Sequence, residues 1–167
     1  MYFSDYELIN FMSVRHIKTN LNNRGLVLIE GENLDADAFD SNGSGKSTIF
    51  DDGITWILYG ETVRGLKGDA VVNKFVGKNT VGRLVIIDGS ETYEIIRHRK
   101  HKDFKNSVVL IHNGKTITSK SDTDTSKIIE DILQMDFLSF TNSVLFGQGA
   151  VKMFASSTDS DQKNILS

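Results

Sequence analysis

Cysteine and proline are both absent from the 167 residues of the sequence. Without cysteine, the chain has neither disulfide bonds nor a zinc site built from thiolates. Without proline, its turns depend on other residues, chiefly its 14 glycines. A run of 18 apolar residues, enough for a transmembrane helix, is also missing, and residues 1–5 lack the basic and apolar regions of a signal peptide. We therefore expect a cytoplasmic protein with no membrane partner.

A strong charge of one sign is lacking as well. The formal net charge is −3, so any contact with nucleic acid would need a local basic patch. With 39% hydrophobic and 25% charged residues, the composition is typical of a globular protein. The length fits one domain with a sizeable core.

Residues 41–48 (Ser-Asn-Gly-Ser-Gly-Lys-Ser-Thr) have the clearest chemical meaning. They follow an apolar run at 26–29 (Leu-Val-Leu-Ile), which predicts a buried strand, and precede residues 49–59, whose apolar spacing predicts a helix. A strand, a glycine-rich turn, a Lys-Ser pair and a helix form the context of a phosphate-binding loop. Glycines let backbone N–H groups point at phosphate oxygens, and the helix N-terminus adds partial positive charge.

We therefore predict that this loop binds ATP and Mg²⁺. Lys46 would reach the β- and γ-phosphates as the catalytic cation, the Ser47 hydroxyl would hold Mg²⁺, and Thr48 would pack on the helix. One departure is that Asp40 stands where G-x-x-x-x-G-K-[ST] has its first glycine, at the end of an acidic loop. The nucleotide-binding residues predicted from the motif are Asn42, Gly43, Ser44, Gly45, Lys46, Ser47 and Thr48.

The rest of the chain predicts paired strands and two helices. Residues 6–12 and 17–21 are expected to pair, and two hairpins are expected to turn at 88–89 (Asp-Gly) and 113–114 (Asn-Gly). Thr125 is expected to cap a helix through 133, followed by a helical turn over 135–142 and a strand-like run at 143–146. The predicted fold class is α/β, with a mixed sheet, antiparallel hairpins and flanking helices.

Three segments leave alternatives open. Residues 84–88 match the second ATPase motif, four apolar residues before Asp, but Gly89 replaces the expected Glu base, so a hairpin turn is favoured. Gln148 lies between two glycines, where its amide either contacts Mg²⁺ or occupies an exposed turn. The basic run 97–102 (Arg-His-Arg-Lys-His-Lys) either contacts DNA phosphates or forms a solvated hairpin end.

Five segments carry a resemblance to a known family: 9–13 (Ile-Asn-Phe-Met-Ser), 28–31 (Leu-Ile-Glu-Gly), 42–48, 56–62 (Trp-Ile-Leu-Tyr-Gly-Glu-Thr) and 140–149 (Phe-Thr-Asn-Ser-Val-Leu-Phe-Gly-Gln-Gly). In this order they resemble the N-terminal half of the ATPase head in SMC-like, SbcC-type double-strand-break repair ATPases, including phage recombination endonuclease large subunits. The resemblance spans nearly the whole chain. It implies an ABC-type P-loop lobe over 1–155 and, over 156–167, the start of a helix leading toward a coiled coil.

The resemblance also implies roles for residues outside the loop. Gln148 would contact Mg²⁺ together with Ser47 and take part in catalysis. Ser13 fits the family's nucleotide-contact pattern, and Asn73 and Lys74 would border the adenine or ribose. The family often has Arg or Lys in the position of Met12, and Arg15 is a candidate substitute. Residues 32–41 are an acidic insertion relative to the family.

The resemblance further implies ATP hydrolysis in a split active site. A C-terminal lobe of the same polypeptide would supply the signature motif and the Asp-Glu strand, and two heads would form a homodimer around two ATP molecules. A metallophosphoesterase nuclease subunit would join them to process ends of double-stranded DNA, in a bacterial or phage-infected cell. The segment alone should bind ATP–Mg²⁺ weakly and hydrolyse little of it. The alternatives are an SMC-type DNA clamp without a nuclease and a self-contained P-loop phosphotransferase.

Overall fold

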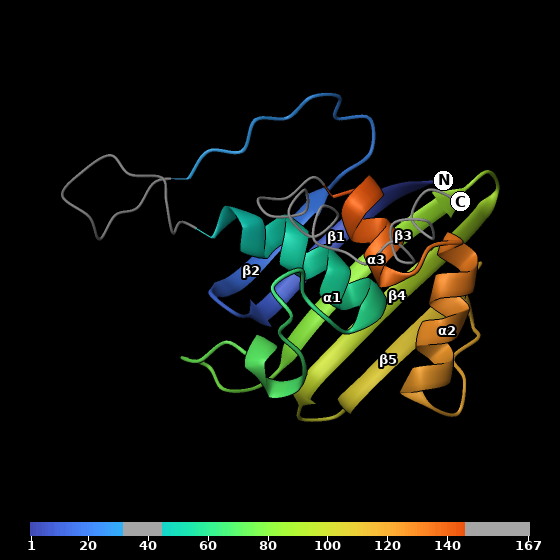
Figure 1. Cartoon of the computed structure of the whole chain (residues 1–167). Helices are drawn as coiled ribbons and strands as arrows, with labels where there is room; N and C mark the ends of the chain where they lie inside the picture. Colours follow the sequence, from blue (N-terminus) through green and yellow to red (C-terminus); the bar gives the residue numbers. More distant parts are fainter. Residues whose placement is uncertain (32–44, 146–167) are drawn as a thin grey trace, which may run out of the picture.

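The structure, a computed structural model, describes residues 1–31 and 45–145. Its framework is a six-stranded sheet in the order β2-β1-β3-β4-β5-β6, and every neighbouring pair is antiparallel (Figure 1). The mixed sheet predicted from the sequence is therefore not found in the described part. The strands are β1 (Tyr2–Phe11), β2 (Val14–Asn20), β3 (Thr80–Asp88), β4 (Glu91–His101), β5 (Lys105–His112) and β6 (Lys115–Thr116).

The helices α1, α2 and α3 lie over the same face of this sheet (Figure 1). α1 crosses β3 and β4, and α2 lies against β5. The helical elements of the described residues are η1 (Thr48–Asp52), α1 (Gly53–Tyr59), η2 (Gly68–Val71), α2 (Asp122–Leu133) and α3 (Phe137–Ser143). None of the helices in this part is both long and apolar enough to cross a lipid bilayer.

The core lies between α1 and the sheet. Trp56 and Ile57 of α1 are buried there together with Leu84 of β3. A glycine in β3 permits the close approach, since a Cβ at Gly82 would lie 2.5 Å from Ile57 Cγ1 and 2.8 Å from a Trp56 ring carbon. This packing fixes the axis of the helix that follows the phosphate-loop motif.

The predicted hairpins are confirmed. β3 and β4 turn at Gly89, with Asp88 paired to Glu91, and β5 and β6 turn at Gly114. Both glycines have positive φ, as a two-residue hairpin turn requires. Asp88 is the last residue of β3, next to the turn at residues 89–90, so the hairpin forms that was favoured over the second ATPase motif. β1 and β2 also pair as predicted, with Leu8 opposite Ile17.

The strand predicted at 26–29 is wrong for the described part of the chain. Leu26 and Leu28 are 102% and 81% exposed, and the segment forms no strand. An apolar run indicates a need for burial, but it does not specify the strand beside which it would pair. Both edges of β1 are occupied, by β2 and β3, and residues 26–29 do not pair with the outer edge of β2.

Two predictions near the end of the described chain need correction. The cap of α2 is Ser121, whose hydroxyl accepts from the Asp124 N–H at 3.1 Å, while the Thr125 hydroxyl donates to the Ser121 carbonyl at 3.0 Å. Ser121 is the cap rather than Thr125, because its extended backbone directs its side chain at the first turn of α2. The predicted helical turn after α2 is confirmed as α3, but Val144 follows α3 without forming a strand.

Candidate nucleotide-binding site

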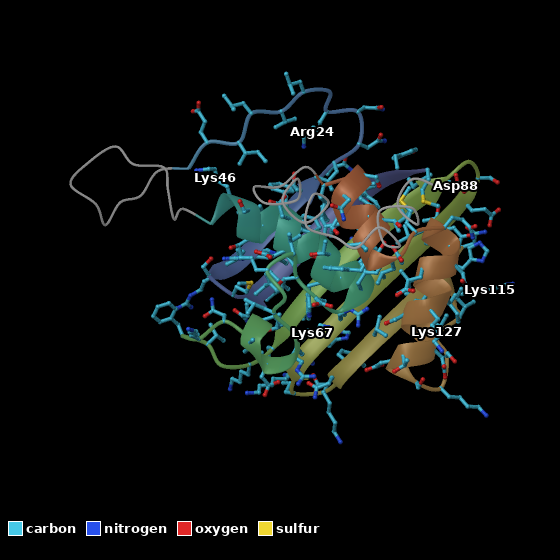
Figure 2. All side chains as sticks on the ribbon, viewed as in Figure 1. Arg24, Lys46, Lys67, Asp88, Lys115 and Lys127 are labelled. Carbon is cyan, nitrogen blue, oxygen red and sulfur yellow. The ribbon has the colours of Figure 1, made fainter. Side chains whose placement is uncertain are left out.

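The predicted phosphate loop leads directly into a helix. The chain is helical from Lys46 through Tyr59, and the Ile49 N–H donates to the Gly45 carbonyl at 3.0 Å. The first N–H groups of a helix have no partner within it, and for this reason helix N-termini are a common place for anions to bind. Figure 2 labels Lys46 at this N-terminal end. The predicted motif therefore has the helix that anion binding requires.

Gly45 occupies a backbone position suited to glycine and lies beside the β1–β2 turn. Its φ is +87°, and a Cβ there would lie 3.4 Å from Ser13 Oγ. Ser13 is exposed and follows Met12 in the two-residue turn between β1 and β2. The φ of Met12 is 48°, a left-handed conformation that reverses the chain there. The structure thus brings together two predicted nucleotide contacts that lie far apart in the sequence, Ser13 and Gly45.

A second loop is joined to the same turn by backbone hydrogen bonds. The Met12 N–H donates to the Val71 carbonyl at 2.8 Å, and the Asn73 N–H donates to the Asn10 carbonyl at 2.9 Å. Asn73 is 1% exposed, and its Oδ1 accepts from the N–H groups of Phe75 and Val76 at 3.0 and 3.1 Å. The predicted Asn73 side chain therefore shapes its own turn, whereas Lys74 is exposed.

An ion pair that sequence reasoning missed supports the start of the helix. Arg64 donates through Nε to Asp52 Oδ2 at 2.8 Å and through Nη2 to the same oxygen and to Thr48 Oγ1, the latter at 2.8 Å. Asp52 is 1% exposed, so its carboxylate is buried against the loop that follows α1. Thr48 is also buried, and its hydroxyl accepts from Arg64. No sequence motif links Arg64 to Asp52, so the sequence did not indicate this contact.

The first turns of this helix depart from α geometry. The Gly53 N–H donates to the Thr48 carbonyl, five residues back, and the Tyr6 hydroxyl takes the Ile49 carbonyl that Gly53 would otherwise use. Burial, and secondarily the charge of Asp52, raises the pKa of Tyr6 well above its usual value, so the phenol stays a neutral donor. Such π-helical turns recur at functional sites.

Two arginines and a lysine of the basic run 97–102 bond other groups of the protein. Arg97 donates through Nε to the Ile57 carbonyl at 2.9 Å and through Nη2 to the Leu58 carbonyl at 3.2 Å, at the C-terminal end of α1. Loss of hydration lowers the pKa of Arg97 to about 10, so it remains charged at neutral pH. Arg99 and Lys100 both pair with Asp69, which leaves Lys102 as the most exposed lysine or arginine of the run.

Several predicted site residues lie outside the described residues. These are Asn42, Gly43, Ser44 and Gln148, together with the acidic insertion and the predicted helix at 156–167. Within residues 1–31 and 45–145, no three His, Asp or Glu side chains gather where they could hold a metal ion. The prediction of Mg²⁺ therefore depends on the nucleotide and on Ser47 and Gln148.

The known proteins that are similar to this chain are nuclease subunits and a DNA-repair ATPase. A 115-residue stretch is 36% identical to the SbcC subunit of the nuclease SbcCD from Deinococcus radiodurans, and 128 residues are 34% identical to the probable exonuclease subunit 2 of Escherichia phage T5. Over 166 residues, the chain is 26% identical to the DNA double-strand break repair Rad50 ATPase of Methanococcus maripaludis. These alignments cover 64%, 75% and 99% of the chain but only 12%, 20% and 15% of the relatives.

A family model described as AAA domain matches residues 7–167, nearly the whole chain. This match includes the β1–β2 turn, the phosphate-loop motif and the helix that carries Lys46. The chain therefore belongs to the AAA domain family, and the relatives that it resembles are SbcC-type ATPases.

Proposed function

We propose that this chain is the ATP-binding N-terminal lobe of a DNA-repair ATPase that works with a nuclease subunit on DNA ends. The observation that carries the proposal is the position of Gly45, with φ of +87°, between Ser13 and the start of the Lys46 helix. Glycine in that position leaves room and backbone N–H groups for phosphate oxygens. The names of the similar proteins, a nuclease subunit, an exonuclease subunit and a repair ATPase, support the rest.

The residues present fit a Mg²⁺-bound nucleotide. The helix N-terminus and Lys46 would hold the phosphates, and the Ser47 hydroxyl with the Gln148 amide oxygen would complete the oxygen ligands that Mg²⁺ prefers. When bound, Mg²⁺ neutralises charge on the phosphates. The chain's own contribution is to fix the direction of the helix, through the Arg64–Asp52 pair at its start and Arg97 at its end.

The exposed run at 26–29 suits a partner lobe of the same polypeptide. Its four apolar residues precede the phosphate loop, and Leu26 and Leu28 are the most exposed of them. A C-terminal lobe would cover them and supply the catalytic base, and a second head would close the dimer over the nucleotide. We place this ATPase in the cytoplasm of a bacterial or phage-infected cell, because two of the relatives come from a bacterium and a phage.

The alternative of a self-contained phosphotransferase is less well supported. Such an enzyme would need mobile arginines over its substrate, but Arg64 and Arg97 are held by helix contacts and Arg99 by Asp69. The similarity to SbcC-type proteins also favours the repair ATPase.

Binding of ATP–Mg²⁺ by the complete protein tests this proposal. Lys46→Ala should weaken binding or abolish hydrolysis, because the ammonium group facing the phosphates is lost. Lys127→Ala is the matched control, since Lys127 is exposed on α2, away from the phosphate loop (Figure 2). Equal ATP affinity and equal hydrolysis in wild type and Lys46→Ala would contradict the proposal, as would an identical loss in both variants.

A further inference from the structure

A polar cavity of about 80 Å³ lies beyond the C-terminal end of α1. The end of α1, η2 and the start of α2 meet there at the end of the sheet where β4 turns into β5 (Figure 1). Roughly 10–15 Å³ of such volume holds one water, so the cavity suits about five heavy atoms, as in orthophosphate. The length of η1 and α1, roughly 18 Å, separates it from the phosphate loop. Its lining includes Gly60, Gly68, Arg97, Arg99, Asn106 and Asp122.

Both arginines of this cavity keep N–H groups that have no acceptor among the described residues. Arg97 uses Nε and Nη2 for two carbonyls at the end of α1 and for the Ser126 hydroxyl, so Nη1 remains. Arg99 uses Nε for Asp69 Oδ1 at 2.7 Å, so its Nη2 remains. Guanidinium N–H groups are among the strongest donors to phosphate oxygens, because the donor is charged and planar.

Two glycines leave these N–H groups uncovered. A Cβ at Gly60 would lie 3.2 Å from Arg97 Nη1, and a Cβ at Gly68 would lie 3.3 Å from Arg99 Nη2. Both glycines have positive φ, +77° and +57°, so they also reverse the chain at these points. A side chain at either position would cover the unbonded end of a guanidinium group. The backbone therefore leaves room for a ligand beside both arginines.

Asn106 adds a neutral donor, and nearby carboxylates do not cancel the positive charge. Asn106 Oδ1 accepts from the Lys100 N–H at 2.9 Å, so its Nδ2 is without an acceptor in the described part of the chain. Asp122 Oδ1 accepts from the Val108 N–H at 3.1 Å. The two arginines and Lys100 face the carboxylates of Asp69 and Asp122, so one positive charge remains. The electrostatic balance favours an anion.

We propose that this cavity binds a phosphate group, either free orthophosphate or the terminal phosphate of a nucleic-acid strand. Arg97 Nη1, Arg99 Nη2 and Asn106 Nδ2 would donate to its oxygens. The site lies outside the proposed nucleotide site and does not depend on it. Burial lowers the pKa of Arg97 to about 10, and an anion beside it would offset the cost of keeping that charge away from water.

Titration calorimetry with orthophosphate on the complete protein, at constant ionic strength, tests this inference. The parent protein and all variants carry Lys46→Ala, so that the phosphate loop is impaired equally in each. Arg99→Ala should weaken orthophosphate binding about tenfold, because charge-assisted hydrogen bonds are lost. Arg83→Ala is the matched control and should leave binding unchanged. The Arg83 side chain is 30% exposed and paired with a carboxylate, as is that of Arg99, but it does not line the cavity.

A second variant tests the sign of the charge effect. Asp122→Asn should tighten orthophosphate binding severalfold, because it removes a carboxylate that faces the anion and keeps an oxygen for the Val108 N–H. A purely structural role of the cavity does not predict this gain. The source of the phosphate is then found with an oligonucleotide that carries either a 5′-phosphate or a 5′-hydroxyl group.

Absence of orthophosphate binding in the parent protein would overturn the inference, as would equal affinities of the parent and Arg99→Ala. Weaker or unchanged binding by Asp122→Asn would also contradict it. A preference for the 5′-phosphorylated oligonucleotide that Arg99→Ala removes would identify a strand end as the ligand. With orthophosphate bound as expected, equal affinity for the two oligonucleotides would identify free orthophosphate as the ligand.

Discussion

The Tyr6 hydroxyl donates a hydrogen bond to the backbone carbonyl of Ile49, linking β1 to the first turn of the helix that follows the phosphate loop. Gly53 lies directly over this contact, where a Cβ would collide with the Tyr6 hydroxyl and lie 2.6 Å from Leu8 Cδ1. The helix therefore approaches the sheet more closely than a residue with a side chain would allow. This approach determines where the N-terminal N–H groups point.

Gly53→Ala should lower the free energy of unfolding by about 3 kcal/mol, because the new methyl group meets a packed strand. Urea unfolding at equilibrium measures this change. Tyr6→Phe alone should cost about 1 kcal/mol through the lost hydrogen bond. The double variant should cost less than the sum of the two, since removing the hydroxyl makes room for the methyl group. Strict additivity would contradict the proposed collision.

Arg64→Ala should destabilise the protein by about 3 kcal/mol, because the buried Asp52 carboxylate loses its partner. Adding Asp52→Asn should recover part of that loss, since the uncompensated charge disappears. A double-mutant cycle followed by thermal unfolding measures the coupling. No recovery in the double variant would show that Arg64 acts through other contacts.

Arg97→Ala should cost about 2 kcal/mol, because two carbonyls at the end of α1 lose a charged donor. Arg99→Ala is the matched control, as it removes a similar side chain whose pair with Asp69 is exposed, and should cost clearly less than Arg97→Ala. The comparison uses unfolding midpoints in denaturant. Equal losses for the two variants would contradict the capping role of Arg97.

Asp51→Asn should stabilise the protein at neutral pH and have no effect near pH 3. Burial, and then the charge of Asp52, raises the pKa of Asp51 above its usual value of 3.8. A carboxyl whose folded pKa is raised binds more protons in the folded state, so its contribution to stability falls as pH rises above 3.8. Removing the charge eliminates that penalty. Unfolding curves at about pH 3 and pH 7 measure it, and a gain at low pH alone would show the opposite sign.

Local patterns predicted the hairpins and the end of α1, but not the start of α2. The glycines at 89 and 114 each lie in a two-residue turn whose chemistry needs no distant partner, so the local sequence specifies β3–β4 and β5–β6, although the first turn is Gly89-Ser90 and not Asp88-Gly89. The end of α1 at Gly60, with φ of +77°, follows from the same local logic. The family resemblance predicted Ser13 as a nucleotide contact, which stays a prediction, and the structure places Ser13 beside Gly45.

Long-range contacts were not predictable in this way. Nothing in the spacing of Arg64 or Arg97 indicates that one binds a carboxylate at the start of the helix and the other binds carbonyls at its end. The same limit applies to the sheet. An apolar run such as 26–29 signals a preference for burial, but the partner that would cover it is encoded elsewhere in the chain or its assembly.

That uncovered run has a consequence for handling the protein. Leu26 to Ile29 combine high β-propensity with no charge and no proline, the composition from which intermolecular β-pairing and precipitation begin. Arg24 and Glu30 are the nearest charges that oppose such self-association. A concentrated solution of the protein should therefore become turbid when no partner covers residues 26–29, even though the protein carries a net charge of −3. Leu28→Lys should delay this turbidity.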